Sequence, residues 1–84
     1  MAATIEQTIK ELLVERLFLD IAPSSIEDNT PLSAYGIDSF LLLELIVVME
    51  EVFNVQFEQG DITAESLRTV QSLADLVRGH QALA

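Results

Sequence analysis

Apolar residues recur at helical spacing in three stretches of the chain, and each stretch predicts an amphipathic helix. A shorter helix is expected from Asp61 or Thr63 to about Leu67. Gly79 marks the end, or the fraying, of the last helix. The longer helices are expected over residues 4–18, 39–53 and 70–79. The pattern therefore predicts an all-α fold, a small four-helix bundle with three longer helices and one short helix.

Residues that commonly cap helices stand at the ends of these stretches. Thr4 opens a sequence with the form of a capping box. Asp38 or Ser39 can cap the central helix with a side-chain oxygen, and Thr69 can cap the last helix in the same way. Asn54 suits the C-terminal end of the central helix. The helix boundaries therefore rest on cap residues as well as on apolar spacing.

A long segment without helical periodicity, residues 19–38, separates the first helix from the central one. It holds both prolines of the chain and Gly36, which most simply supplies a turn. Loops of about 20 residues are uncommon in small domains and are most often functional or disordered. An ordered loop is expected here, because four apolar residues can pin it to the core: Ile21, Ile26, Leu32 and Ile37.

The central helix is apolar on two sides when it is projected at 100° per residue. The side expected to face the core carries Leu42, Leu45, Met49, Val52 and Phe53, flanked by Ile46. The opposite side, named here the outward strip, consists of Phe40, Leu43 and Val47 bordered by Glu44, Glu50 and Glu51. This strip either packs against the long loop or another helix, or serves as a docking surface whose carboxylates steer a basic partner.

Composition excludes several classes of function. The 84 residues carry a formal charge of −10 with only four basic residues, so a nucleic-acid backbone would be repelled. The absence of cysteine and the single histidine, His80, exclude disulfides and thiolate or multi-histidine metal sites. Residues 40–49 form the most apolar window, which is too short to insert across a membrane. No secretory signal is visible, so one cytoplasmic domain over residues 1–84 is expected.

The segment Gly36-Ile37-Asp38-Ser39-Phe40, at the junction of the long loop and the central helix, resembles the G-x-D-S-[LF] motif of the acyl carrier protein family. This family includes the related peptidyl carrier domains. The resemblance extends over nearly the whole chain, through Met49-Glu50-Glu51-Val52-Phe53, Ile62, Thr69-Val70-Gln71 and Gly79-His80-Gln81-Ala82. Taken without it, Ser39 would most simply be a helix N-cap.

The resemblance implies a cofactor, its site and a set of partners. Ser39 would carry a covalent 4′-phosphopantetheine arm, whose thiol bears the cargo as a thioester. Asp38 would help the phosphopantetheinyl transferase and its magnesium ion engage the serine. Acyl-loading and acyl-processing enzymes would dock through basic patches, and the family positions for this docking are matched by Phe40, Leu43, Glu44, Val47, Glu50 and Glu51.

Two residues depart from the pattern of many fatty-acid carriers. Leu41 is apolar where many have a polar or charged residue, and Phe40 replaces the commoner leucine. We therefore expect a free-standing, monomeric, specialised acyl carrier in fatty acid, polyketide or modified-lipid synthesis. The alternatives are an aminoacyl or peptidyl carrier of a nonribosomal-type pathway, and a helical adaptor without a prosthetic group.

Two further classes fit the sequence less well. A serine hydrolase is disfavoured because Ser39 lacks the G-x-S-x-G elbow and His80, near the C-terminus, is expected to be an exposed surface residue. A calcium site is disfavoured because the acidic segments 27–28 and 61–65 lack the spacing of a calcium loop. No catalytic residue and no metal ligand is therefore assigned.

Overall fold

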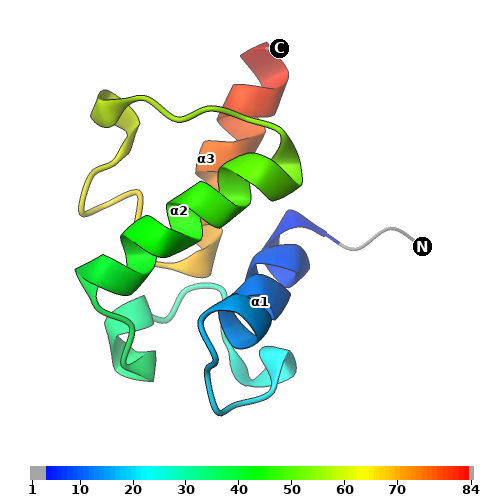
Figure 1. Ribbon diagram of the computed structural model, residues 1–84, viewed down its shortest axis with the longest axis vertical. Helices are drawn as coiled ribbons and strands as arrows, with labels where there is room; N and C mark the ends of the chain where they lie inside the picture. The colour runs from blue at the N-terminus through cyan, green and yellow to red at the C-terminus, as the bar shows by residue number, and fades with distance from the viewer. Residues whose placement is uncertain (1–3, 84) are drawn as a thin grey trace.

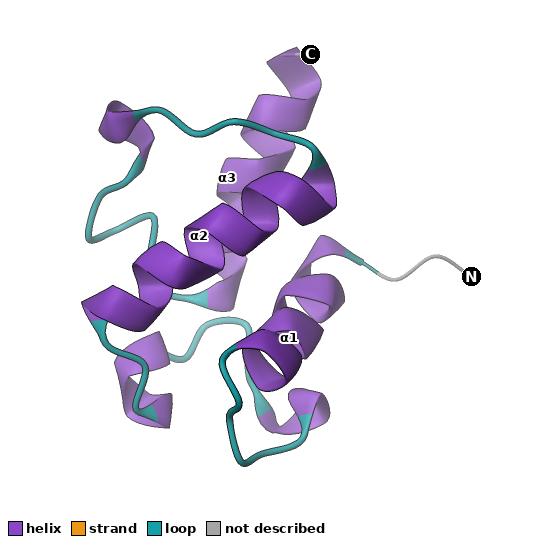
Figure 2. Cartoon of the chain, viewed as in Figure 1, coloured by secondary structure: helices purple, strands orange, loops and turns teal. Residues whose placement is uncertain are grey.

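The three longer helices form where the apolar periodicity predicts them. In the computed structural model, which describes residues 4–83, α1 spans Ile5–Arg16, α2 spans Ser39–Phe53 and α3 spans Val70–Leu83. In Figure 1, α2 crosses in front of α3, and α1 lies beside them. The connecting segments contain the short 3₁₀ helices η1 (Pro23–Ser25), η2 (Leu32–Tyr35) and η3 (Gln59–Asp61), and no strand occurs among the described residues (Figure 2).

The predicted caps are confirmed at both ends of the chain. The Gln7 main-chain N–H donates to Thr4 Oγ1 at 3.1 Å, and the Ser72 N–H donates to Thr69 Oγ1 at 3.0 Å. Each bond satisfies one of the main-chain donors that the first turn of a helix leaves free. Asn54 ends α2 with φ +53°, in the left-handed region that asparagine tolerates better than most residues.

Fifteen apolar side chains form the core, drawn from all three helices and from the long loop. The loop residues Ile26, Leu32 and Ile37 are buried as expected, whereas Ile21 is exposed. From the helices come Ile9, Leu12, Leu13, Leu45, Ile46, Met49, Val70, Leu73, Ala74 and Val77. Leu17 joins them from the C-cap of α1, and Phe57 from the segment after α2. Within the described part of the chain, no helix combines the length and apolar character needed to cross a bilayer.

The expected short fourth helix is not confirmed. Residues 64–67 form a turn, with main-chain bonds from the Leu67 N–H to the Thr63 carbonyl at 3.1 Å and from the Arg68 N–H to the Glu65 carbonyl at 3.3 Å. Hydroxyl groups take over the local hydrogen bonding, since Thr63 Oγ1 accepts the Ser66 N–H and Ser66 Oγ donates to the Asp61 carbonyl at 2.6 Å. Serine and threonine compete with helix formation in this way, so turns and η3 replace the helix.

The prediction that the last helix ends at Gly79 is wrong, because α3 continues to Leu83. A glycine inside a helix costs about 1 kcal/mol relative to alanine. Contacts on both sides of Gly79 hold this turn, since Val77 is fully buried and His80 Nε2 lies 2.9 Å from Asp61 Oδ2. Tertiary contacts therefore override the local preference of glycine.

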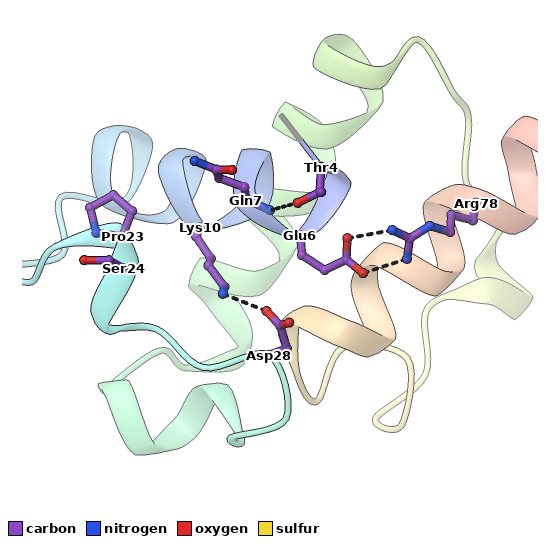
Figure 3. Close-up of a pocket in the computed structure, with 8 residues that line it drawn as sticks. All are labelled: Thr4, Glu6, Gln7, Lys10, Pro23, Ser24, Asp28 and Arg78. Carbon is purple, nitrogen blue, oxygen red and sulfur yellow. Dashed lines mark hydrogen bonds and ion pairs between the residues drawn. The ribbon is translucent and has the colours of Figure 1, made fainter. Parts of the chain in front are cut away.

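Two ion pairs join α1 to the rest of the molecule (Figure 3). Arg78 on α3 donates to both carboxylate oxygens of Glu6, at 2.6 and 2.7 Å, and Lys10 Nζ lies 2.7 Å from Asp28 Oδ1 on the long loop. The Arg78 hydrogen bonds lower the pKa of Glu6 from 4.5 to about 2. Bidentate arginine–carboxylate pairs are the stronger kind of charged contact, and this one connects the two ends of the chain.

The Glu6–Arg78 pair predicts a pH-dependent part of the stability. Because the folded protein lowers the pKa of Glu6 from 4.5 to about 2, the ionised carboxylate stabilises the fold above pH 4.5, and this contribution is lost as the pH falls towards 2. Glu6→Gln should therefore lower the free energy of unfolding at neutral pH and have little effect near pH 2. Denaturant titrations across this range measure the difference.

Glu11→Gln is the matched control, because Glu11 is exposed on the same helix. It should change the stability by no more than about 0.5 kcal/mol at neutral pH. A Glu6→Gln effect that is independent of pH would contradict the ion-pair explanation.

Candidate functional site

Asp38 and Ser39 lie where the long loop enters α2, and their side chains have different tasks. Asp38 is the N-cap: its Oδ1 accepts the Leu41 N–H at 2.9 Å, and its carbonyl accepts the Leu42 N–H at 3.0 Å. Ser39 is the first residue of α2, and its side chain is exposed. Since Asp38 makes the capping bond, the Ser39 hydroxyl is left free of that role and faces solvent.

Gly36 turns the chain into this junction. Its φ of +80° lies in the left-handed region, and its N–H donates to the carbonyls of η2. The next residue, Ile37, is buried, and its N–H donates to the Leu32 carbonyl at 3.4 Å. The turn therefore sends Ile37 into the core and brings Ser39 to the surface. This confirms the turn predicted for Gly36.

Hydrogen bonds fix the loop that leads to Ser39. The Leu32 N–H donates to the Arg68 carbonyl at 2.8 Å, and the Gln71 N–H donates to the Asp28 carbonyl at 2.9 Å. Tyr35 also packs on the loop, with its hydroxyl accepting the Glu27 N–H at 2.9 Å. The loop is therefore bound to the segment that opens α3.

An open groove of ≈ 580 Å³ lies beside Ser39. Its walls are mainly apolar and come from the loop, from α2 and from the turn before α3. Ser39 and Asp38 stand at the α2 side, and Arg68 stands at the α3 side. The apolar lining includes Leu32, Ile37, Leu42 and Leu67.

The outward strip is exposed to solvent. The exposed fractions are 76% for Phe40, 52% for Leu43 and 56% for Val47. Together with Glu44 these side chains line one shallow hollow on α2, and Glu51 is exposed farther along the helix. Of the two interpretations of this face, the structure therefore supports an open surface over a packed one.

Glu50 differs from the other two acidic residues of the strip. Its side chain is half-buried, and its Oε2 accepts the Phe57 N–H at 2.9 Å. This bond holds the segment after α2, which brings the Phe57 ring into the core. Sequence reasoning missed this task, because the bond joins a helix to a segment without periodicity. Val52 was also expected in the core, but it is 44% exposed.

The expectation that His80 is an exposed surface residue is wrong. Its side chain is half-buried, with Nε2 2.9 Å from Asp61 Oδ2 and its ring edge-on to Phe57 at a centroid distance of 5.0 Å. The Glu58 N–H, and then His80, lower the pKa of Asp61. His80 therefore attaches α3 to η3.

Comparisons with known proteins agree with this geometry. Residues 7–77 match the family described as phosphopantetheine attachment site. The fold is similar to the solution structure of holo acyl carrier protein from Nitrosomonas europaea, with a TM-score of 0.82, 21% identity, and coverage of 95% of this chain and 99% of that one.

Two further similar structures are complexes of an engineered glycine:[carrier protein] ligase from Bradyrhizobium japonicum. Each contains a carrier protein from Agrobacterium tumefaciens, one with ATP and the other with AMP. The matched chains are 27% identical to this one with TM-scores of 0.77, and the alignments cover 88% and 87% of this chain and 96% and 97% of theirs. Each matched chain is therefore about as long as this one.

The small helical fold and the solvent-facing serine at the start of its central helix are the arrangement that the sequence predicts for a carrier protein. Because residues 7–77 match the family described as phosphopantetheine attachment site, the chain belongs to that family, whose members carry phosphopantetheine covalently. The residues present fit such a group, because the Ser39 hydroxyl is exposed, lies outside the capping bond and borders an open groove.

The turn at Gly36 predicts a position-specific cost. An added Cβ meets no atom within 4 Å at Gly36 or at Gly60, but only Gly36 of the two has a positive φ. Gly36→Ala should therefore destabilise the protein by about 1–2 kcal/mol through backbone strain alone. Gly60→Ala is the matched control and should be neutral or slightly stabilising. Urea unfolding measures both, and equal effects would contradict the argument.

Proposed function

We propose that the protein carries 4′-phosphopantetheine on Ser39 and presents acyl cargo to partner enzymes. When bound, the arm supplies a thiol that holds the cargo as a thioester. The observation that carries the proposal is the exposed Ser39 hydroxyl, set at the first residue of α2 and left free by the Asp38 cap, within the matched residues 7–77. The protein acts as a shuttle and leaves the chemistry on the cargo to its partners.

The surroundings of Ser39 support attachment by a phosphopantetheinyl transferase. In this reaction, Ser39 Oγ forms a bond to the phosphorus that bears pantetheine in coenzyme A. The bond from that phosphorus to the nucleotide phosphate breaks, the nucleotide leaves as adenosine 3′,5′-bisphosphate, and the serine proton passes to a base or water. The first-turn N–H groups and the positive end of the α2 dipole favour the resulting phosphodiester. Asp38 Oδ2 lies outside the capping bond and is free to engage the transferase and its magnesium ion.

The outward strip is the docking surface of this proposal. Phe40, Leu43 and Val47 supply apolar contact, while Glu44 and Glu51 attract basic patches on the transferase and on acyl-loading or acyl-processing enzymes. Glu50 acts mainly through its bond to the Phe57 N–H. A net charge of −10 adds to the steering of basic partners.

An aminoacyl cargo is the second candidate. One observation favours it: the carrier-sized chains in the glycine:[carrier protein] ligase complexes are 27% identical to this chain. An acyl cargo in fatty acid, polyketide or modified-lipid synthesis agrees with the family and with the carrier fold. The intact mass of the protein isolated from its source separates the two, because it reports the arm and the cargo together.

Attachment at Ser39 is tested by mass spectrometry. After incubation with a phosphopantetheinyl transferase and coenzyme A, the protein should gain the mass of one arm, and Ser39→Ala should gain none. Ser33→Ala is the matched control, because Ser33 is an exposed serine that lines the same groove, and it should be modified like the unaltered protein. No mass gain with several transferases would overturn the proposal in favour of a helical adaptor.

Steering by the outward strip is tested by charge reversal. Glu44→Lys should slow modification of Ser39 by lowering the association rate, and the difference should shrink as salt screens the charges. Glu65→Lys reverses an exposed charge outside the strip and should have the smaller effect. Initial rates of arm transfer at low and high salt measure this.

Glu50 needs its own comparison, because Glu50→Lys also breaks the bond to the Phe57 N–H. That variant should lose about 1–3 kcal/mol of stability by leaving a part-buried donor unpaired. Glu44→Lys should unfold like the unaltered protein. Identical transfer rates for Glu44→Lys and the unaltered protein at low salt would rule out steering at that position.

A further inference from the structure

Arg68 has a distinctive position in this acidic molecule. Among residues 4–83, it is the only basic residue that lines the groove beside Ser39. Lys10 and Arg78 are bound to carboxylates that line a different pocket. The Arg68 side chain is exposed, so its guanidinium is accessible at the edge of the groove.

The main chain holds Arg68 against the loop that leads to Ser39. The Arg68 carbonyl accepts the Leu32 N–H at 2.8 Å, and its own N–H donates to the Glu65 carbonyl at 3.3 Å. The side chain therefore starts from a fixed point in the turn before α3, which lines the groove together with α2. Asp38 is the acidic residue that lines the groove, and its Oδ1 is already engaged by the Leu41 N–H.

We propose that Arg68 binds the phosphodiester of the arm and that the groove holds the pantetheine portion beside it. This inference rests on the proposed attachment at Ser39. A guanidinium pairs well with phosphate oxygens, because its planar donors match two of them at once. The apolar walls suit the geminal methyl groups of pantetheine, and the Ser33 hydroxyl, also at the groove, can serve one of its amides.

The contact is exposed and therefore weak. Surface ion pairs contribute up to about 1 kcal/mol, so Arg68 should raise the ratio of bound to free arm by about two- to fivefold. A weak hold leaves the arm free to enter a partner enzyme, while lowering the time that a loaded thioester spends fully exposed to water. Arg68 acts here as a positioning residue.

Phosphorus and proton NMR on the holo-protein test this inference. The protein is loaded by transferase and coenzyme A, and the intact mass verifies one arm. Arg68→Gln should move the ³¹P resonance and weaken contacts between the arm methyl groups and Leu42 or Leu67 by about two- to fivefold. Arg68→Lys should retain part of these contacts. Arg16→Gln, at an exposed arginine in the last turn of α1, is the matched control and should change neither signal.

The outcomes separate this inference from the proposed function. No mass gain in the unaltered protein overturns the attachment and, with it, the role of Arg68. Full loading with identical ³¹P shifts and arm contacts in the unaltered and Arg68→Gln proteins overturns the role of Arg68 alone. The role of Arg68 is also overturned if Arg68→Gln slows loading and leaves the arm signals unchanged, since that result indicates that Arg68 contacts the transferase. It is likewise overturned if Arg68→Gln changes the NMR spectrum of the apo-protein as much as that of the holo-protein, since the effect is then independent of the arm.

Discussion

Two main-chain hydrogen bonds tie the long loop to the start of α3, and the position of Ser39 depends on them. They run from the Leu32 N–H to the Arg68 carbonyl and from the Gln71 N–H to the Asp28 carbonyl. Ordering a loop of this length costs conformational entropy at every residue. Burial of its apolar side chains offsets that cost, and the two bonds decide where the loop lies. The end of the loop, and with it the first turn of α2, is thereby held at one place on the bundle.

The features that sequence predicts correctly are those with a local cause. Apolar periodicity locates the three long helices, and the caps at Thr4, Asp38 and Thr69 act within three residues of themselves. The short fourth helix fails for a local reason, the hydroxyl bonds of Thr63 and Ser66, whereas two other features were missed because a distant contact decides them. Glu50 bonds a main-chain group seven residues away, and His80 meets a carboxylate nineteen residues away. Phe57 and Asp61 lie outside the helices that carry Glu50 and His80, so helical periodicity carries no signal for either contact.

The acidic residues are divided between internal bonds and open surface. Glu6, Asp28 and Asp61 are bonded to basic side chains that connect separate elements, and the pKa of Glu6 is lowered accordingly. Glu44 and Glu51 remain exposed beside the outward strip. Composition gives only the net charge of −10, and this number does not distinguish the bonded carboxylates from the exposed ones. The tertiary structure does: Glu44 lies beside the apolar residues of the strip close to Ser39, and Glu51 is exposed farther along α2.

Helical geometry gives the first turns of α2 two working faces. Ser39 and Leu42, three residues apart, line the groove, whereas Phe40, Leu43 and Val47 line the outward strip. In the proposed function, a partner seated on the strip would approach Ser39 from the side and leave the groove open. Under the proposed role of Arg68, the arm would pass from the groove to the partner without any change in the bundle. The irregular segment before α3 supplies Ala64, Leu67 and Arg68 to the groove, while the outward strip on α2 stays exposed.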